Sequence, residues 1–431
     1  MKICFVSDYL PFYHKFWGGA EQATSRFQDL FNQKGHQTII LFKKPQKQVS
    51  ENSATLQYFA IPVLEDYLPK RIAHSVGQIK ANLFPLDLFS YVSSYKALKQ
   101  ANPDILHLHN FQSLSFSLVL AAKRLHIPIV YSIYDYWCLC PLGTLVNCEK
   151  KACRKFHGSY CAKCIKCFAF QDLSELNVSF LSFWLIFRKK IFDFFLKRMD
   201  AFVVLSKSSS DILCEYGINK EKIFAIPLFL SKDIDDPIAN QVSNEKDSIL
   251  YVGWIHPRKG LHVLLEAMPK VLEEIADAKL YVIGENVDDG YMNKIKEIIR
   301  KNELDDKVFL LGKRNFQEVK EFFQKTAVVV IPEQWENMSP VILGESMYFG
   351  KAIVASKIGG IPEFVTDGEN GLLAIPTDPS DFAKKIIKVL KDRRLMQEMG
   401  DNARKTAKCL FSEETKYRRL LNLYQSLVNT P

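Results

Sequence analysis

Two segments in the second half of the chain carry charged side chains in a pattern that suits an anionic ligand. In residues 253–260 (GWIHPRKG), Gly253 follows an apolar run, and the cations Arg258 and Lys259 precede a helical pattern. A glycine at a strand end lets a ligand approach the backbone, and cations at a helix N-terminus favour an anion such as a diphosphate. A tight turn with solvated basic side chains explains the segment equally well, so both interpretations stay open.

The second segment, residues 332–340 (PEQWENMSP), places acids around a predicted helix start. Glu336 lies in the polar loop, and Glu345 lies in the helical pattern that follows. At the carboxyl end of a parallel strand, a carboxylate can accept the hydroxyls of a ribose or another sugar. For Glu336 alone, stabilisation of the helix dipole is the stronger interpretation, and for the pair the two interpretations are close.

Two histidines, His107 and His109, occupy alternate positions in the apolar run of residues 104–109 (DILHLH). Side chains two residues apart in a strand lie on the same face of the sheet. A single histidine there is more often a packing residue, but a pair at the ligand end of a strand favours a role in a site. His109 is nearer that end and is the preferred ligand contact.

Seven of the ten cysteines fall between Cys138 and Cys167, in a basic stretch. Their spacings could gather several thiolates around one ion, and four thiolates suit a structural zinc. The Cys-x-x-Cys-x-x-Cys run is also compatible with iron–sulfur ligation, and a set of free thiols in a loop is the alternative to any metal. The hypothesis is a small lid held by zinc, whose ligands come from Cys148, Cys153, Cys161, Cys164 and Cys167.

Residues 173–199 mix Phe, Trp and Leu with basic side chains, among them Arg188, Lys189 and Lys190. Basic, aromatic-rich amphipathic helices lie at anionic membrane surfaces, whereas a core helix with a snorkelling basic face is the ordinary alternative. Charge decides between them, because residues 1–228 hold 28 Lys and Arg against 17 Asp and Glu, while the remainder is nearly neutral. The sequence therefore favours peripheral binding to an anionic membrane surface.

The elements that must position these residues alternate between short apolar runs and helical patterns. This βαβ order occurs twice, which predicts an α/β protein with two facing, Rossmann-like, doubly wound parallel sheets that bind ligands at the carboxyl ends of their strands. Ser206 ends one strand and is the expected N-cap of the next helix. The predicted strands are residues 2–7, 37–42, 104–109, 129–133, 201–206, 248–253, 279–283, 308–311, 327–331 and 352–355.

The predicted domain organisation follows from where the pattern restarts. A polar, Pro-containing stretch in residues 231–247 is the expected linker. The first domain is then residues 1–230, with the cysteine-rich insertion at 138–167, and the second is residues 248–411. Residues 412–431 form a final helix with no strand after it, and we expect it to pack on the first domain.

The composition excludes several classes of protein. With 48% hydrophobic and 24% charged residues among 431, the chain is an ordinary globular one and not disordered or collagen-like. No apolar stretch reaches the ~18–20 residues that span a bilayer. Asp8 ends the first apolar run before a secretory core forms, so we expect a cytoplasmic location, at the inner face of the cell membrane if the chain binds membranes.

In their order and spacing, these motifs resemble the retaining glycosyltransferases of group 1, or family 4, which have GT-B architecture. The resemblance covers nearly the whole chain except the cysteine segment and the helical stretch after it. It departs from the family pattern at Trp254, where Arg is usual, at Tyr134-Asp135, where His-Asp is usual, and in glutamates nine residues apart instead of eight. The matching motifs are GGAE (18–21), DILHLH (104–109), Gly253 to Lys259-Gly260, Glu336, Glu345, GKAIVAS (350–356), GGIPE (359–363), Asp367-Gly368 and Gly371-Leu372.

The resemblance implies a nucleotide-diphosphate sugar as donor, retention at the anomeric carbon, and a glycan or lipid-linked acceptor in surface polysaccharide synthesis, with no cofactor and no nucleic acid. It implies catalytic roles for His109, Arg258, Lys259 and Glu336. The residues it implies for the donor are Gly18, Gly19, Gly253, Arg258, Lys259, Glu336, Asn337, Met338, Ser339, Pro340 and Glu345; those on the acceptor side are Glu21, His107, Tyr134 and Asp135. The departures keep two alternatives open, namely an inactive nucleotide-sugar-binding scaffold or partner subunit and a sugar-nucleotide epimerase of the same architecture.

Overall fold

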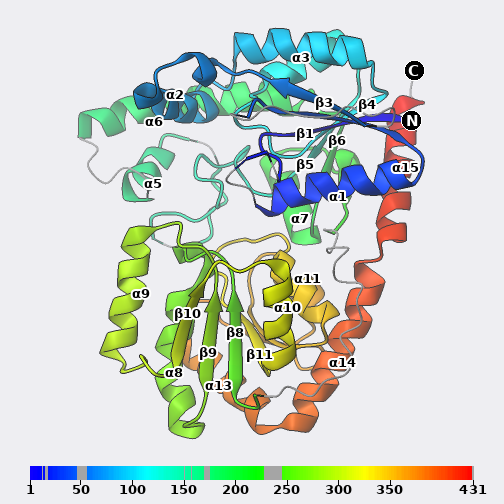
Figure 1. Ribbon diagram of the computed structural model, residues 1–431. Helices are drawn as coiled ribbons and strands as arrows, with labels where there is room; N and C mark the ends of the chain where they lie inside the picture. Colours follow the sequence, from blue (N-terminus) through cyan, green and yellow to red (C-terminus); the bar gives the residue numbers. More distant parts are fainter. Residues whose placement is uncertain are drawn as a thin grey trace. The chain divides into compact units, whose positions relative to one another are not determined.

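The chain divides into two compact units, shown in the computed structural model of Figure 1. Unit 1 comprises Met1–Phe229 and Glu413–Pro431, and unit 2 comprises Leu230–Ser412. The structure describes residues 1–11, 13–14, 18–45, 56–149, 151–156, 158–168, 175–227 and 245–429. Most of the expected linker, residues 231–247, lies outside the described residues.

Unit 1 is built on a seven-stranded sheet in the order β3-β2-β1-β4-β5-β6-β7, and every neighbouring pair is parallel. The order reverses at β1 and β4, which makes the sheet doubly wound. The central strand β1 has five fully buried residues, as expected for a parallel sheet covered on both faces. The strands are β1 (Lys2–Ser7), β2 (Gln37–Lys43), β3 (Leu56–Ile61), β4 (Ile105–Leu108), β5 (Ile129–Ser132), β6 (Ala201–Val204) and β7 (Ile223–Ala225).

Helices cover both faces of this sheet, and Figure 1 shows α3 and α1 on opposite faces. The α7 helix begins where expected, because the Ser206 hydroxyl accepts the backbone N–H of Ser209. The helices of unit 1 are α1 (Gly19–Gln33), η1 (Leu64–Tyr67), α2 (Lys70–Asn82), α3 (Leu88–Ala101), α4 (Ser117–Arg124), α5 (Cys161–Phe168), α6 (Glu175–Leu196), α7 (Lys207–Tyr216), η2 (Lys220–Lys222) and α15 (Glu413–Val428).

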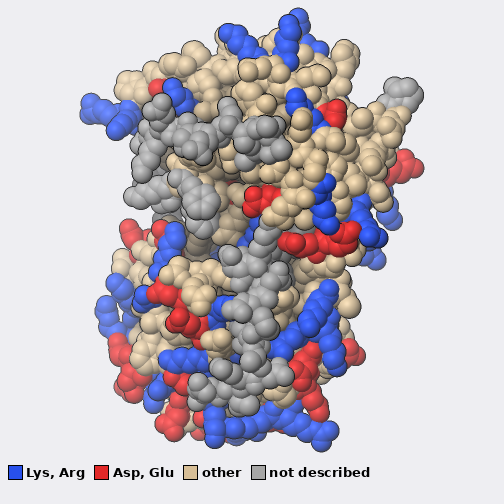
Figure 2. Space-filling view, turned by 45° about the vertical axis from the view of Figure 1, so that its right-hand side comes forward, with Lys and Arg blue, Asp and Glu red and all other residues tan. Residues whose placement is uncertain are grey.

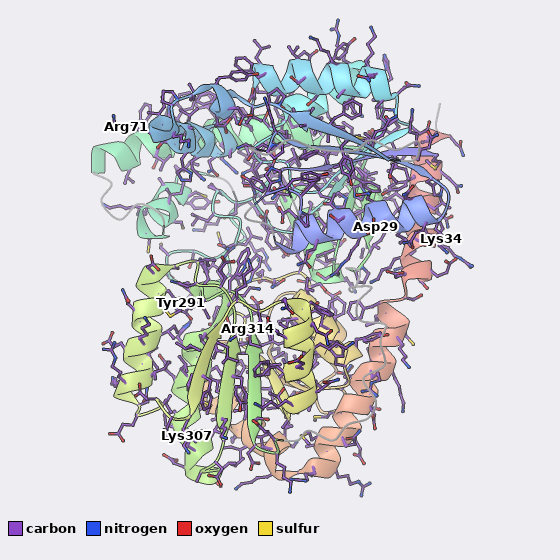
Figure 3. The ribbon with its side chains drawn as sticks, viewed as in Figure 1. Asp29, Lys34, Arg71, Tyr291, Lys307 and Arg314 are labelled. Atoms are coloured by element: carbon purple, nitrogen blue, oxygen red, sulfur yellow. The ribbon has the colours of Figure 1, made fainter. Side chains whose placement is uncertain are left out.

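The helix α15 comes from the end of the chain and packs against unit 1. Lys34 at the end of α1 bonds Glu414 at 2.7 Å, and Figure 3 shows Lys34 beside this helix. The Tyr417 hydroxyl bonds His36 at 2.8 Å, and the Tyr424 ring lies 5.4 Å from that of Phe31.

Unit 2 has a six-stranded parallel sheet in the order β10-β9-β8-β11-β12-β13. Its strands are β8 (Ser248–Val252), β9 (Lys279–Ile283), β10 (Val308–Gly312), β11 (Val328–Ile331), β12 (Ala352–Ser356) and β13 (Leu372–Ala374). Its helices are η4 (Pro257–Lys259), α8 (Leu261–Glu274), α9 (Asp289–Lys301), α10 (Phe316–Lys325), α11 (Val341–Tyr348), α12 (Ile361–Phe364), α13 (Pro379–Lys391) and α14 (Arg393–Leu410).

Alternate residues of the unit 2 strands enter two separate hydrophobic cores. Val328 and Val330 pack with residues of α8, α9 and α13, whereas Val329 packs with residues of α10, α11 and α14. This alternation follows from the two-residue period of a strand. The two cores hold the sheet rigidly from both faces, and the loops at its carboxyl edge stay accessible for a site.

Three strands lie outside the ranges that the sequence predicted, namely β3, β7 and β13, and all three stand at sheet edges. β7 and β13 have three residues each, which is too short for an apolar run to be recognised. β7 is also the least buried of them, as an edge strand needs fewer apolar side chains.

Candidate active site

The basic segment (residues 253–260) and the acidic segment (residues 332–340) of unit 2 meet at one edge of its sheet. Strands β8 and β11 are parallel neighbours, so the loops that follow Val252 and Ile331 leave the sheet side by side. The backbone N–H of Gln334 donates to the carbonyl of Arg258 at 2.8 Å. The Arg258 guanidinium also lies 5.2 Å from the centre of the Trp335 ring. Two segments that are about 80 residues apart therefore form one structure at the ligand end of the sheet.

Residues 253–260 form the loop that we call the cation loop, and its shape depends on His256 and Gly260. The His256 imidazole accepts the backbone N–H of Arg258 at 3.2 Å and so caps the short helix η4. Burial, with the nearby Arg258 charge, lowers the pKa of His256 to about 4, which keeps the ring neutral. Gly260 has φ of +70°, and a Cβ there would stand 1.7 Å from the carbonyl oxygen of Pro332. Only glycine allows the two loops to approach this closely.

Lys259 is not a freely moving cation. Its ammonium bonds the carboxylate of Glu333 at 2.5 Å, and that carboxylate is almost fully buried. The other carboxylate oxygen accepts the indole N–H of Trp335 at 2.6 Å, and Asn337 donates to the first at 3.0 Å. The lysine is therefore held by an acid that is itself fixed by two further donors, Trp335 and Asn337, which places the ammonium at a defined position.

Sequence reasoning missed Glu333, Trp335 and His256. Glu333 stands two residues after the end of β11, where a side chain reaches the carboxyl edge of the sheet. That position could have identified Glu333 from the sequence. The donor-sugar role was assigned to Glu336 instead, because Glu336 matches the family pattern. His256 acts on the backbone of Arg258 in its own loop, whereas Trp335 also meets Arg258 of the facing loop, a contact that no spacing within one segment reveals.

The remaining residues predicted to bind the donor lie in residues 332–340, which we call the acid loop, and in the helix after it. Glu336, Asn337, Met338, Ser339 and Glu345 are all buried, and Pro340 is the residue before α11. The Asn337 carbonyl accepts the backbone N–H of Gly360 at 2.8 Å.

The glycine pair of the GGIPE motif has a physical reason in this structure. Gly359 has φ of +58°, and a Cβ there would stand 2.3 Å from the carbonyl oxygen of Asn337. The loop after β12 thus clamps the acid loop from the side opposite the cation loop. Loops from three adjacent strands, β8, β11 and β12, fix the backbone around Glu336 and Asn337.

Gly253 and Trp254 follow β8 directly. Gly253 lies against the ring of Tyr251, whose hydroxyl donates to the Trp254 carbonyl at 3.0 Å. The exposed fraction of Trp254 is 43%, so the side chain that replaces the usual arginine projects into solvent in unit 2. Arg258 is the neighbouring cation that contacts the acid loop.

In unit 1, His109 lies directly after β4 at the carboxyl edge of the sheet. Its Nδ1 bonds the Tyr134 hydroxyl at 2.7 Å, and its ring stacks on that of Tyr134. Among the residues that the structure describes, its buried Nε2 has no hydrogen-bond partner. Burial, with the neighbouring His107, lowers the pKa of His109 well below its ordinary value. A neutral imidazole with one unsatisfied nitrogen is suited to a ligand oxygen.

The structure corrects the acceptor-side role expected of His107. Its Nδ1 bonds the Tyr424 hydroxyl at 2.6 Å and its Nε2 bonds the Ser132 hydroxyl at 2.8 Å, so both ring nitrogens are occupied within unit 1. The side chain is fully buried, which lowers its pKa to about 3. His107 therefore supports its neighbours, because no ring nitrogen remains for a substrate.

Glu21 ties the start of α1 to the same edge of the sheet. One of its carboxylate oxygens accepts the backbone N–H of Gly18 at 2.7 Å, and the other accepts the amide of Asn110 at 2.8 Å. The backbone amide of Gly18, which was expected among the donor-binding residues, is thus bonded to Glu21, while Gly19 begins α1. Asp135 accepts the backbone N–H of Trp137 at 2.8 Å and so closes a turn after β5.

The comparison with known proteins decides the family. A family model described as "Glycosyltransferase Family 4" matches residues 17–231, and one described as "Glycosyl transferases group 1" matches residues 233–406. The two matches correspond to the two units and cover most of the chain. The chain belongs to the group 1 glycosyltransferases.

Relatives of this glycosyltransferase share its architecture at low identity. An uncharacterized glycosyltransferase of Methanocaldococcus jannaschii is 28% identical over 246 residues, which are 53% of this chain and 66% of that protein. The match thus spans just under two thirds of that relative. Sucrose-phosphate synthase from Thermosynechococcus elongatus has a TM-score of 0.72 at 17% identity, covering 100% of both chains. Anabaena HepE in complex with UDP and glucose has a TM-score of 0.68 at 16% identity, covering 99% of this chain and 100% of that one. These likenesses confirm the predicted GT-B fold.

Several cysteines of the 138–167 segment lie close together around α5. Cys161 is buried and donates its thiol to the Phe156 carbonyl at 3.0 Å, and the Cys164 thiol contacts that of Cys148. Burial raises the pKa of Cys161 to about 12 and that of Cys164 to about 11. Within the described ranges, no three His, Cys, Asp or Glu side chains are arranged to hold a metal ion. The structural zinc stays a prediction.

The described helices include none with the length and apolar character needed to cross a membrane. The longest described helix, α6, has 22 residues and contains the buried Arg188, which donates to the carbonyls of Asn82 and Trp137. Those bonds fix α6 to the end of α2 inside unit 1.

Proposed function

We propose that this glycosyltransferase moves a sugar from a nucleotide-diphosphate sugar, with retention at the anomeric carbon, to a glycan or lipid-linked acceptor in surface polysaccharide synthesis. The observation that carries the proposal is the joined pair of loops in unit 2, where Arg258 and the anchored Lys259 lie against the acid loop. A sugar nucleotide needs both parts, because its diphosphate calls for cations and its sugar and ribose hydroxyls call for carboxylates.

The reaction breaks the bond between the anomeric carbon and the diphosphate oxygen, and the electron pair leaves with the diphosphate. Negative charge grows on that leaving group, and donors fixed in advance at this point lower the barrier most. Lys259 fits this role because Glu333 holds its ammonium in place. Arg258 supplies the second charge from its position over Trp335.

The acceptor hydroxyl oxygen then bonds the anomeric carbon on the face that the diphosphate leaves, which gives retention. Its proton passes to the departing phosphate oxygen, so the step needs neither a carboxylate nucleophile nor a cofactor. Glu345 holds the ribose and Glu336 meets the donor sugar, both from buried positions around the start of α11. The Nε2 of His109, which has no hydrogen-bond partner among the described residues, contacts a substrate oxygen.

The experiment that tests the proposal measures nucleotide release from UDP-, GDP- and ADP-sugars, with and without a crude extract of lipid-linked glycans. We expect release from one donor, stimulated by the extract and lost in Glu345→Gln. Glu321→Gln, a change at an exposed position of α10 in the same unit, serves as the matched control. Tight donor binding without release, with every acceptor tried, would favour the scaffold alternative, and interconversion of the donor sugar without transfer would favour the epimerase.

A membrane surface as partner is supported by exposed aromatic side chains of unit 1. On α6, Phe180 and Phe183 have exposed fractions of 65% and 58%. Phe84, in the turn after α2, lies against Trp184 of α6 with ring centres 4.6 Å apart, so the two segments form one apolar surface. Leu88, at the start of α3, is a further exposed apolar residue of unit 1, with an exposed fraction of 74%. Exposed apolar areas of this kind are typical of surfaces that bind a partner or a membrane.

Cations accompany this apolar surface. Lys190 lies over the ring of Phe187, and Arg198 lies over the ring of Phe194. Arg71 stands on α2, as Figure 3 shows. Figure 2 shows a neighbouring face of unit 1, which is largely uncharged and carries Lys and Arg side chains together with a few Asp and Glu. Aromatic side chains enter the headgroup region while neighbouring cations attract anionic lipids.

Co-sedimentation with vesicles tests this partner without reference to activity. We expect binding to vesicles that contain anionic lipid, weak binding to neutral ones, and loss of binding in Phe180→Ser/Phe183→Ser. Ile375→Ser, which changes an exposed apolar residue of unit 2, is the matched control. Equal binding to both kinds of vesicle, or none, would contradict the proposal.

We also propose that the cysteine segment binds a zinc ion. This zinc would stabilise the fold and take no part in catalysis. Metal analysis of protein purified without a histidine tag tests it. A content near one equivalent, lost together with thermal stability in Cys161→Ser/Cys164→Ser, would support it. Less than ~0.2 equivalents of zinc or iron would leave free thiols as the explanation.

A further inference from the structure

Trp254 is an exposed aromatic side chain at the ligand end of the unit 2 sheet. It stands two residues after β8, at the carboxyl edge where a parallel sheet binds ligands. Its exposed fraction is 43%, whereas every other aromatic side chain described in unit 2 is buried or half-buried. Unit 2 therefore shows its one exposed ring, among the described residues, at the place where a substrate arrives.

The backbone that carries this ring is held on both sides. The Tyr251 hydroxyl donates to the Trp254 carbonyl at 3.0 Å. The backbone N–H of the next residue, Ile255, donates to the Glu285 carbonyl at 2.9 Å, and the Ile255 side chain is buried. The indole is thus presented from a fixed position, which reduces the entropy that a ligand contact costs.

The same pairing places two charged side chains next to the ring. Strands β8 and β9 lie side by side in Figure 1, and their parallel pairing continues into the loops as a bridge between Ile255 and Asn286. One residue earlier, Trp254 lies beside Glu285, and neighbours paired in this way point to the same face. The Glu285 carboxylate bonds the ammonium of Lys313, just after β10, at 2.8 Å. Both side chains remain accessible, with exposed fractions of 34% and 58%.

An exposed indole beside a carboxylate and an ammonium suits a sugar ring. A pyranose has an apolar face formed by its C–H groups, and an aromatic ring is the apolar surface that matches this face in size. Its hydroxyls both donate and accept, so a carboxylate can accept from one while an ammonium donates to another. The indole carries no charge, so it gives no such match to a phosphate.

The place of Trp254 in the cation loop favours the acceptor over the donor. At the other end of that loop, Arg258 lies against the acid loop on the β11 side, where the proposed function places the donor. Trp254 lies on the β9 side of the loop. The donor already has its cations and carboxylates, and the acceptor is the substrate that has no assigned contact in unit 2.

We propose that Trp254 stacks on a sugar ring of the acceptor, while Glu285 and Lys313 bind hydroxyls of the same ring. The inference rests on the proposed function and narrows its acceptor to one whose terminal unit is a sugar. Trp254 then determines acceptor specificity and takes no part in the departure of the diphosphate.

Saturation-transfer NMR with the methyl glycosides of glucose, galactose, mannose and N-acetylglucosamine tests this contact without turnover. We expect the C–H protons on one face of at least one glycoside to receive saturation from the wild type. This signal should be lost in Trp254→Ala and kept in Trp254→Phe, which retains an aromatic ring. Leu410→Ala changes an exposed apolar residue at the end of α14, and this matched control should give the wild-type signal.

The kinetics of nucleotide release separate the acceptor from the donor. Trp254→Ala should raise KM for the extract of lipid-linked glycans by about three- to tenfold, which is the value of one aromatic contact. The KM for the donor and the kcat at saturating acceptor should stay within about a factor of two, and Trp254→Phe should restore most of the acceptor KM. A merely structural role would instead change kcat and both KM values together.

Calorimetry with UDP, GDP and ADP distinguishes a sugar from a base on the ring. A lower affinity of Trp254→Ala for a nucleotide would mean that the ring stacks on the donor base, and it would overturn the inference. A wild type that transfers saturation to no glycoside would overturn it too, as would an acceptor KM that is the same in Trp254→Ala. A glycoside signal that depends on Trp254, in a protein that releases no nucleotide from any donor, would leave the sugar contact standing and refute the proposed function instead.

Discussion

The pair formed by Lys259 and Glu333 makes the sharpest test of the donor site. Glu333 is almost fully buried, and it holds the lysine ammonium at 2.5 Å. Glu333→Gln keeps the side-chain shape and a carbonyl for the Trp335 indole but removes the charge that restrains the lysine. A freed lysine regains about 2 kcal/mol of side-chain rotamer entropy, which must be lost again when it binds the leaving group. At 1.36 kcal/mol per tenfold, this predicts a fall in kcat of about 30-fold.

Lys259→Ala removes the donor itself, and its expected loss of 10²–10³ in kcat follows from the loss of one oxyanion donor. Once the lysine is gone, the charge of Glu333 has nothing left to restrain. The double variant should therefore be no more than about threefold slower than Lys259→Ala, which corresponds to an interaction energy of at least about 1.4 kcal/mol. Steady-state kinetics of nucleotide release from the preferred donor measure all four proteins.

Glu398→Gln is the matched control, because it breaks an exposed ion pair on α14 whose residues bond at 2.8 Å. Exposed pairs contribute little, so its rate should stay within a factor of two. A Glu333→Gln enzyme as fast as the wild type, or faster, would refute the reasoning. Such a result would mean that Lys259 acts through its charge alone and that its fixed position is irrelevant.

Three further predictions concern stability and donor binding. Lys80→Met should reduce the free energy of unfolding of unit 1 by about 3–5 kcal/mol, measured in urea, because it strands two buried carboxylates, whereas Lys189→Met at a half-exposed pair should lose under about 1 kcal/mol. Gly260→Ala should abolish donor binding measured by calorimetry, while Gly312→Ala, with the same φ of +70° but open space around it, should bind normally and lose about 1–2 kcal/mol. Because burial lowers the pKa of His107 to about 3 from 6.5, the unfolded chain binds more protons between these values, and stability falls as pH is lowered through that window. His107→Gln should flatten this dependence by about 1.4 kcal/mol per pH unit, and an unchanged slope would refute the assignment.

Much of the site could be predicted because its motifs are local. The cation loop, the acid loop and the histidine strand can each be recognised by residue type within a few positions of a predicted strand end. A parallel sheet brings all such ends to one edge, so their grouping within each unit follows from topology alone. The order of the motifs was also enough for the family and the fold class.

The parts that could not be predicted depend on contacts between segments far apart in the sequence. Glu333 matters because Lys259, 74 residues away, lies against it. His107 loses its expected role because Tyr424, 317 residues away, takes one of its nitrogens. A hydrogen bond is decided by a few tenths of an ångström, and spacing along the chain carries no information at that scale.

The sequence by itself determined the two sheets, the chemistry of the loops at their ends and the basic character of the first half. These properties depend on periodicity, residue type and composition, which are local or additive. Only the tertiary structure decided which charges are paired and which ring nitrogens of the histidines are bonded. Those properties depend on which groups meet after folding, since pairing, desolvation and tautomer are set by neighbours in space.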